Sequence, residues 1–211
     1  MQRGRLITVE GVDGAGKTTL VDALAGALRA RGREVAVLRE PGGVELSERI
    51  RALVKDPALR VDARAEALLY AAARAQLVAE RVGPALAAGS WVLLDRFVDS
   101  SLAYQGAGRG LGVAAVRAIN DFATGGLTPD RTLLLRVDAA TRARRQSVRG
   151  EAPDRLERED GTFFDAIAGA YDALAAAEPG RFRVLDAGAS PPALLDAALA
   201  AVGDLTAATH Q

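Results

Sequence analysis

The sequence predicts an α/β fold in three layers, with a five-stranded parallel sheet between two layers of helices. Short apolar runs alternate along the chain with longer segments that have the apolar spacing of helices, as expected when parallel strands are joined through helices. No repeat, linker or shift in composition divides the 211 residues. We therefore expect a single domain, 1–211, with one main core.

The expected strands and helices follow from these two patterns. Five apolar runs are predicted to be buried strands, namely Leu6–Glu10, Val35–Arg39, Trp91–Asp95, Thr132–Val137 and Phe182–Asp186. Helical spacing fills the intervals between them. The expected helices are Thr18–Arg31, Leu46–Val54, Ala63–Val82, Val113–Phe122, Ala139–Val148, Phe163–Ala177 and Pro191–Val202. No element is predicted for the tail, Asp204–Gln211.

The composition excludes several kinds of chemistry. Lys+Arg and Asp+Glu both total 27, so no net charge attracts nucleic acid or an anionic membrane. The absence of cysteine rules out thiol catalysis and cysteine-ligated zinc, and the only histidine, His210, lies at the C-terminal end, where chains usually fray. The sequence has no signal peptide and no apolar run near the roughly 18–20 residues that span a bilayer. We expect a cytoplasmic protein without nucleic-acid or membrane partners.

A phosphate-binding motif follows the first predicted strand. It fits the P-loop pattern G-x-x-x-x-G-K-[ST] and consists of Gly11, Val12, Asp13, Gly14, Ala15, Gly16, Lys17 and Thr18. Glycines let successive backbone N–H groups converge on phosphate oxygens, and the next helix directs the positive end of its dipole to the same place. Lys17 is expected to contact the β- and γ-phosphates of ATP, and Thr18 to ligate Mg²⁺. A functionless glycine-rich turn is the alternative, but the flanking strand and helix favour a P-loop.

A carboxylate at the end of the third predicted strand supplies the second expected element. In P-loop enzymes a residue such as Asp95 holds Mg²⁺ or its water shell, although Asp95 could instead cap the strand or pair with Arg96. The N-K-x-D element of guanine-binding proteins is missing, and Arg96 stands where hydrolytic ATPases more often have an acidic base. A kinase needs separate arginines and a closing lid. Six arginines from Arg142 to Arg158 indicate a mobile lid over about 142–160.

Four motifs resemble those of bacterial thymidylate kinases, and they occur in the order found in that family. They are EGVDGAGKTT at Glu10–Thr19, REPGG at Arg39–Gly43, DRFVDSSLAYQG at Asp95–Gly106 and TPD at Thr128–Asp130. The resemblance covers essentially the whole chain, and the second and third motifs are the specific ones. It implies a P-loop fold of the nucleoside monophosphate kinase type, ATP and Mg²⁺ as cofactors, dTMP as the acceptor, and a homodimer through Ala63–Val82 and Val113–Phe122. A kinase for another pyrimidine nucleotide or a deoxynucleoside, and a nucleotide-binding switch without turnover, remain as alternatives.

The resemblance also implies residues that bind the acceptor phosphate. The loop of Arg39, Glu40 and Pro41, with the helix after it, would close over dTMP. Arg51 would contact the acceptor phosphate, and Arg96 would hold that phosphate beside the γ-phosphate of ATP. Arginine suits both positions because its planar fork makes bidentate contacts with phosphate.

Further matches imply residues for the base and the sugar. Tyr70 would stack on thymine and Arg74 would donate to its O4, and their i,i+4 spacing places them on one helical face. Tyr70 replaces the phenylalanine usual in the family and could instead be a core aromatic. From the third motif, Ser101 would approach the base, Tyr104 would crowd the sugar 2′ position, and Gln105 belongs to the same expected site.

The expected catalytic residues are Asp13, Lys17, Arg96 and Arg149. Asp13 matches a position associated with the sugar 3′-hydroxyl and the metal. Some thymidylate kinases carry a catalytic arginine inside the P-loop, and this chain has none there. The resemblance then points to Arg149 in the lid, with Arg155 as a second candidate. Phe97 departs from the histidine or tyrosine usual after the DR pair.

Overall fold

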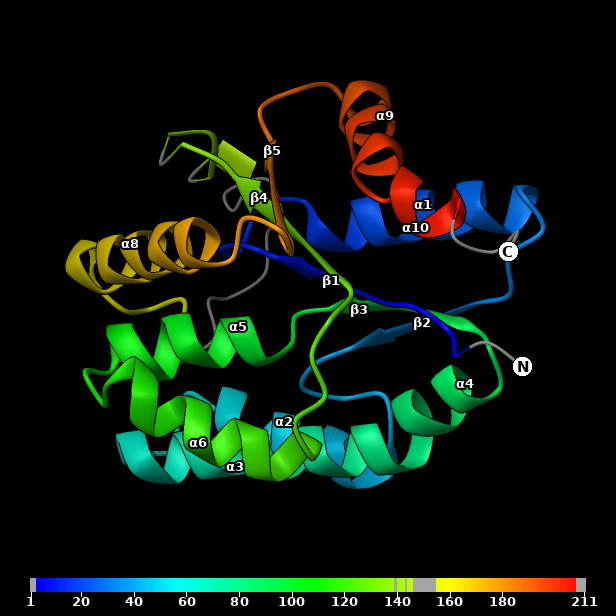
Figure 1. The fold of residues 1–211 in the computed structure, drawn as a ribbon. Coiled ribbons are helices and arrows are strands. Elements are labelled where there is room, and N and C mark those ends of the chain that lie inside the picture. The colour runs from blue at the N-terminus through cyan, green and yellow to red at the C-terminus, as the bar shows by residue number, and fades with distance from the viewer. Residues whose placement is uncertain (1–2, 139, 143, 146–154, 208–211) are drawn as a thin grey trace.

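Five parallel strands form one sheet in the order β2-β3-β1-β4-β5 (Figure 1). The structure, a computed structural model, describes residues 3–138, 140–142, 144–145 and 155–207. The strands are β1 (Leu6–Glu10), β2 (Val35–Arg39), β3 (Trp91–Asp95), β4 (Arg131–Arg136) and β5 (Phe182–Asp186). The α/β fold and its five-stranded parallel sheet are therefore confirmed, and only β4 lies one residue earlier than expected.

Helices cover both faces of this sheet, which gives the three expected layers (Figure 1). One face carries α1 (Lys17–Ala30), α9 (Pro191–Ala201) and α10 (Gly203–Ala207). The other face carries α4 (Gly83–Ala87), α5 (Val98–Ser101), the π-helical turn η2 (Leu102–Gly108), α6 (Val113–Thr124) and α8 (Gly161–Ala177). Beyond them lie α3 (Ala63–Leu77), which packs on α6, and α2 (Glu45–Lys55), which packs on α3.

The pleat of β1 divides its side chains between these two layers. Alternate residues of a strand point to opposite faces of the sheet. Ile7 and Val9 join the buried apolar cluster under α1 and α9, whereas Leu6 belongs to a cluster on the other face. The same alternation places Glu10, the last residue of β1, on the face covered by α5, η2 and α8.

The strand register brings the functional ends of the strands together. Val9 of β1 is aligned with Asp95 of β3, and Asp95 is aligned with Arg39 of β2. The P-loop, the third motif and the REPGG loop therefore start at one edge of the sheet. Open parallel sheets bind ligands at this carboxyl-terminal edge.

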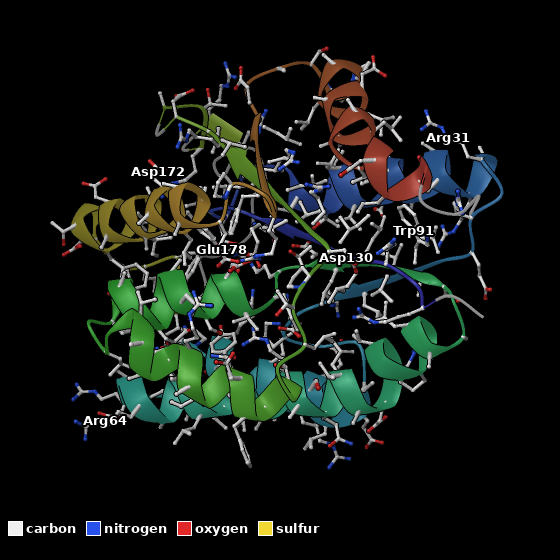
Figure 2. The ribbon with its side chains drawn as sticks, in the orientation of Figure 1. Arg31, Arg64, Trp91, Asp130, Asp172 and Glu178 are labelled. Atoms are coloured by element: carbon white, nitrogen blue, oxygen red, sulfur yellow. The ribbon has the colours of Figure 1, made fainter. Side chains whose placement is uncertain are left out.

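The TPD motif lies at the opposite end of the strands, where β1 and β4 begin. Asp130, labelled in Figure 2 in the link before β4, accepts hydrogen bonds from Leu6 N at 2.8 Å and from Arg5 Nη1 at 3.0 Å. This carboxylate thus ties the start of β1 to the start of β4. The motif lies far along the strands from the P-loop, so its contribution is to the sheet.

Apart from Ala139–Val148, which the structure describes only in part, and three further segments, the helices begin and end within two residues of the expected positions. The helix expected over Ala63–Val82 is α3 followed by a π-helical turn, η1 (Val78–Val82), and by α4. Pro84 lacks the backbone N–H that an α-helical bond to Glu80 would need, which accounts for a wider turn before it.

The other two segments are helical where the sequence predicted nothing. Residues 98–108 form α5 and η2, and nearly all of their side chains are buried. A helix buried on all sides has no polar stripe, so its spacing gives no amphipathic signal. The short α10, in the tail left without an element, packs against α9 through Leu205 and the apolar cluster beneath it.

Part of the arginine-rich segment lies outside the described residues. This includes Arg149 and most of the helix expected over Ala139–Val148, of which 140–142 and 144–145 are described and helical. The lid predicted over 142–160 stays a prediction. Among the residues that the structure describes, no helix is long and apolar enough to cross a membrane.

Candidate active site

The P-loop forms a backbone cradle between β1 and α1. Gly11, Gly14 and Gly16 have φ angles of 138°, 83° and 93°, a region that L side chains rarely adopt. A Cβ on Gly11 would lie 2.6 Å from the Leu135 carbonyl oxygen. Glycine is therefore required here by both conformation and space. The N-terminus of the 14-residue helix α1 begins directly after the loop, at Lys17.

The P-loop lysine is buried and its pKa is lowered. Lys17 is 7% exposed, and its Nζ donates to the Val12 carbonyl oxygen at 3.0 Å. Burial, together with the charge of Arg96, lowers the pKa of Lys17 to about 8. Bound phosphates would favour its charged form, because opposite charge stabilises an ammonium. Lys17 is thus an ammonium held inside the cradle.

Thr18 and Asp95 meet where a metal ion is expected. Thr18 Oγ1 donates to Asp95 Oδ2 at 2.7 Å, although the two residues are 77 positions apart. Mg²⁺ takes oxygen ligands, keeps several waters and binds through one or two carboxylates plus phosphates. A hydroxyl and a carboxylate beside a phosphate cradle fit that ion. No cluster of three or more acidic, histidine or cysteine side chains occurs among the described residues, and Mg²⁺ does not require one.

One cavity of about 580 Å³ opens beside this cradle. It is lined by Lys17, Thr18 and Asp95, and by all eleven residues predicted to bind the acceptor: Asp13, Arg39, Glu40, Pro41, Arg51, Tyr70, Arg74, Arg96, Ser101, Tyr104 and Gln105. These residues come from six separate parts of the chain. The volume lies within the range usual for small-molecule sites.

Asp13, Arg96 and Tyr104 form a cluster between the P-loop and the wider part of the cavity. Arg96 Nη2 donates to Asp13 Oδ1 at 2.8 Å and contacts Tyr104 Oη at 3.2 Å, and Tyr104 Oη donates to Asp13 Oδ2 at 3.2 Å. Burial would raise the pKa of Asp13, but the charges of Arg96 and Lys17 outweigh it and hold this pKa well below its usual range. Asp13 is therefore a carboxylate.

Arg96 has a backbone conformation that is rare for its residue type. Its φ is 69°, the only positive value among the non-glycine residues that the structure describes. A non-glycine residue in the left-handed region costs on the order of 1–3 kcal/mol and persists where the surroundings fix it. Arg96 N donates to Val9 O at 3.0 Å, and the Arg96 guanidinium lies 5.0 Å from the centre of the Tyr104 ring. This conformation turns the side chain into the cavity.

Arg74 lies at the buried end of the cavity and is 2% exposed. Its Nε donates to Glu40 Oε2 at 2.6 Å, and its Nη2 to the Phe97 carbonyl oxygen at 3.0 Å. Its Nη1 donates to Ser101 Oγ at 2.9 Å and to Asn120 Oδ1. A guanidinium has five N–H groups, so one on Nη2 makes no hydrogen bond within the described part of the chain.

Two carboxylates fix the loop that closes this end of the cavity. Burial raises the pKa of Glu40 to about 7, against the opposing charge of Arg74. Glu48 Oε1 accepts from Gly43 N at 2.8 Å and from Arg39 Nη2 at 2.9 Å. Arg51 Nη1 donates to the Pro41 carbonyl oxygen at 2.9 Å, which holds Arg51 at the cavity wall.

A second cavity of about 260 Å³ lies on the other side of the P-loop. It is lined by Ala15, Gly16, Thr19, Leu20, Ala23, Arg145, Ala187, Ala189, Pro191 and Leu194. Arg145 donates to the carbonyl oxygens of Ala15 at 3.2 Å and Ala187 at 2.8 Å. This second cavity could not be predicted from the sequence, because the segment around Ala187 has no motif and Arg145 is one of six arginines in its segment.

The sequence interpretation also missed Lys55. It lines the larger cavity, and its charge contributes to the lowered pKa of Asp13. Lys17 and Lys55 are the only lysines in the chain, and both line this cavity. The rarity of lysine in this sequence was therefore the signal that could have identified Lys55.

Arg155 faces a different set of partners. Its Nη2 donates to Glu66 Oε2 at 2.6 Å, and its Nε donates to the Val54 carbonyl oxygen at 2.9 Å. Glu66 is fully buried and also accepts from Gln105 at 2.8 Å. Arg155 is thus tied to α2 and α3. Arg149 lies outside the described residues.

Two binding regions that share one cavity define the class of the protein. The P-loop cradle suits a nucleoside triphosphate, while Arg96 and Arg51 line the space beside it and an aromatic and a buried arginine lie at its far end. A second phosphorylated substrate next to a P-loop is the arrangement of a P-loop kinase of the nucleoside monophosphate type.

Comparison with known proteins specifies the family within that class. The profile of the family described as thymidylate kinase matches residues 9–197. The thymidylate kinase of Deinococcus radiodurans is 52% identical over 89% of this chain and 90% of its own, and that of Methylococcus capsulatus is 46% identical over the whole of both. The crystal structure of thymidylate kinase from Ehrlichia chaffeensis matches with a TM-score of 0.72 at 30% identity, covering 87% of this chain and 93% of that one. The chain belongs to the thymidylate kinase family.

Proposed function

We propose that the protein transfers the γ-phosphoryl group of ATP to dTMP, giving ADP and dTDP. The observation that carries this proposal is that Lys17, Arg96, Tyr70 and Arg74 all line one cavity, the larger of the two described above. A nucleoside monophosphate bound there would direct its phosphate to the P-loop and its base to the buried end. Membership of the thymidylate kinase family supports dTMP over the other acceptors.

The chain's own groups would perform the transfer by positioning and charge stabilisation. Lys17 would bind the β- and γ-phosphates, and Arg96 would hold the acceptor phosphate close to them, so that the acceptor oxygen lies in line with the breaking bond. Both cations also reduce repulsion between the two substrates. Thr18 and Asp95 would hold Mg²⁺, which when bound neutralises phosphate charge. No histidine base or covalent intermediate is needed.

The second cavity would bind the base of the donor nucleotide. It adjoins the P-loop at Ala15 and Gly16, and a guanidinium, that of Arg145, lies in its wall. Arginine planes stack on aromatic rings. The cavity therefore has the place and the chemistry for the base of ATP. The cytoplasmic location expected from the sequence stays a prediction.

The base site is expected to favour thymine, and uracil more weakly, over cytosine. The N–H groups of Arg74 can donate to the carbonyl O4 of thymine or uracil but not to the amino group of cytosine. A buried donor left without an acceptor costs about 1–3 kcal/mol, or roughly 10- to 100-fold in kcat/KM. ADP release measured with dTMP, dUMP, dCMP and purine monophosphates tests both the activity and the base site.

Each outcome of that comparison has a distinct meaning. Equal kcat/KM for dTMP and dCMP would contradict the proposed base site, with dUMP as the control that keeps O4 and lacks only the methyl group. Transfer to another monophosphate in preference to dTMP would contradict the proposed acceptor. ATP binding without transfer to any acceptor would indicate a nucleotide-binding switch.

We also propose that the protein is a homodimer through α3 and α6. These helices pack side by side on the outside of the fold (Figure 1), and each exposes a large apolar side chain. Phe122 of α6 is 91% exposed and Leu68 of α3 is 56% exposed. Large exposed apolar groups often mark protein–protein contacts.

Replacement of Phe122 by glutamate is expected to convert the dimer into a monomer, because a charge at the centre of an apolar interface is costly. Light scattering coupled to size-exclusion chromatography measures the mass. Val184→Glu is the matched control, since Val184 is an exposed apolar residue of β5, away from both helices. A monomeric wild type, or a dimer retained by Phe122→Glu, would contradict this interface.

A further inference from the structure

Glu10 is a buried carboxylate that the proposed mechanism does not use. It ends β1 directly before the P-loop and is fully buried. The pleat of β1 directs it to the face covered by α5 and α8, where its hydrogen-bond partners lie. Burial, and to a lesser extent the nearby charge of Asp99, raises the pKa of Glu10 to about 7. A carboxylate in such a place requires hydrogen-bond donors around it.

Three donors from two other elements surround this carboxylate. Its Oε1 accepts from Phe97 N at 2.7 Å. Its Oε2 accepts from Ser100 Oγ at 2.6 Å and from Tyr171 Oη at 3.0 Å. Phe97 lies on the turn that follows β3 and Ser100 on α5, which begins directly after that turn, while Tyr171 lies on α8. Glu10 therefore joins the end of β1 to the turn that carries Arg96.

The hydroxyl of Ser100 connects Glu10 to Arg96. Arg96 Nη1 donates to Ser100 Oγ at 2.9 Å. A hydroxyl has one proton, and an ionised carboxylate can only accept. The Ser100 proton is therefore directed to Glu10, which leaves the oxygen lone pairs for Arg96. At the same time the bond from Phe97 N to Glu10 fixes the backbone next to Arg96, whose φ is the positive one.

We propose that Glu10 is a positioning residue for Arg96: through Ser100 and the Phe97 N–H it holds the guanidinium in the direction from which it binds the acceptor phosphate. The inference rests on the proposed function, in which Arg96 contacts that phosphate. Glu10 itself touches neither substrate. Its effect reaches the substrate through the orientation of one side chain.

Glu10→Gln separates this role from simple packing, because it keeps the size of the side chain and removes one acceptor. The amide can accept at one atom only, so either the Phe97 N–H loses its partner or the amide donates towards the hydroxyls. In the second case the Ser100 proton turns towards Arg96 and opposes its donation. Replacing hydrogen-bond partners that orient an active-site group typically lowers affinity or activity by about 10- to 100-fold, as for the partners of metal ligands.

The decisive measurement compares the binding of dTMP with that of thymidine, which lacks the phosphate. Calorimetry is carried out well above the pKa of Glu10, where its carboxylate is ionised. Glu10→Gln is expected to weaken dTMP binding by about 10-fold or more and to leave thymidine binding unchanged. A general loss of structure would weaken both ligands together. Ser100→Ala, which breaks the same link and keeps the carboxylate, is expected to give the same pattern.

Tyr171→Phe is the matched control. It removes one donor from the same carboxylate oxygen and the contact of Tyr171 Oη with Ser100 Oγ at 3.0 Å, but it keeps the bond from Ser100 to Glu10 and the bond from Arg96 to Ser100. It is expected to keep the wild-type preference for dTMP over thymidine. The double variant Glu10→Gln, Ser100→Ala is expected to bind dTMP no more weakly than whichever single variant binds it less tightly, because both substitutions act along one path.

The outcomes separate this inference from the proposed function. A wild-type protein that binds thymidine as tightly as dTMP would contradict the phosphate site itself. A wild type that prefers dTMP, together with Glu10→Gln and Ser100→Ala variants that keep that preference, would overturn the role of Glu10. An equal loss in Tyr171→Phe would show a packing effect instead. If Glu10→Gln does not fold, the binding of dTMP and thymidine by Ser100→Ala alone decides whether the proposal holds.

Discussion

Lys17→Ala is expected to lower kcat by on the order of 10³-fold or more while the protein keeps its fold. The lysine ammonium is buried in the P-loop cradle and makes one hydrogen bond to the described residues, to the Val12 carbonyl oxygen. Its loss removes little from the folded state, because a buried charge is costly to maintain. The charge that builds on the β- and γ-phosphate oxygens during transfer would lose its nearest cation from the chain.

ADP production and thermal unfolding, measured on the same samples, test this expectation. Arg29→Ala is the matched control, since it removes a positive charge from the other end of α1, where Arg29 Nη2 donates to the Val35 carbonyl oxygen at 2.8 Å. It is expected to keep the wild-type kcat. A folded Lys17→Ala protein with wild-type ADP production would be incompatible with phosphoryl transfer at this P-loop.

The sheet could be predicted closely because its three central strands are buried on both faces. A parallel strand covered by helices on either side reads as a continuous apolar run, as in Leu6–Glu10 and Trp91–Asp95. Helices at the surface have an apolar stripe that marks them. Residues 98–108 have neither signal, because their helix lies within the interior and carries serine, tyrosine and glutamine for the site. The polar residues that line the cavity therefore interrupt the apolar spacing that would have predicted this helix.

The predicted site residues lie along one cavity, but the network that fixes them could not be read from the sequence. The P-loop and strand signals predicted Lys17 and Asp95, the third motif predicted Arg96, and the family resemblance predicted Arg74. Glu10 and Ser100 also lie inside those motifs, yet their bond depends on the pleat of β1 and on the turn after β3. Such contacts between distant segments become visible only in three dimensions.

The arginines of the segment predicted to be a lid illustrate the same limit, and the structure shows the contacts of three of them. Arg142 lies over the ring of Phe164 at 3.9 Å, and Arg145 donates to Ala15 and Ala187 beside the second cavity. Arg155, the second candidate for catalysis, is paired with Glu66 and is 13% exposed. The contacts described above for these three guanidiniums are with residues outside the set predicted to bind the acceptor.

Arg149→Ala is therefore expected to lower kcat on the order of 10³-fold, or by roughly 4 kcal/mol of transition-state stabilisation. Positions 12–15 of the P-loop contain no arginine, and Lys17 and the proposed Mg²⁺ would meet only part of the charge that develops on the transferring group. An arginine supplied from the lid would meet the rest. Because that contact would form on closure and strengthen in the transition state, the affinity for ATP is expected to change little.

Separate measurements of kcat and of ATP binding distinguish this role from nucleotide binding. Arg155→Ala is the matched control, since it removes another arginine of the same segment. The partner of Arg155 is the buried carboxylate of Glu66. Arg155→Ala leaves the buried Glu66 carboxylate with Arg109, at 3.2 Å, as its remaining ionic partner among the described residues. Removing one partner of a buried charge destabilises the fold, so this variant is expected to lower the unfolding temperature more than kcat. A large loss of kcat in Arg155→Ala with none in Arg149→Ala would identify Arg155 as the catalytic arginine. Wild-type kcat in both would mean that neither arginine acts from a lid, and that Lys17, Arg96 and the metal carry the transfer by themselves.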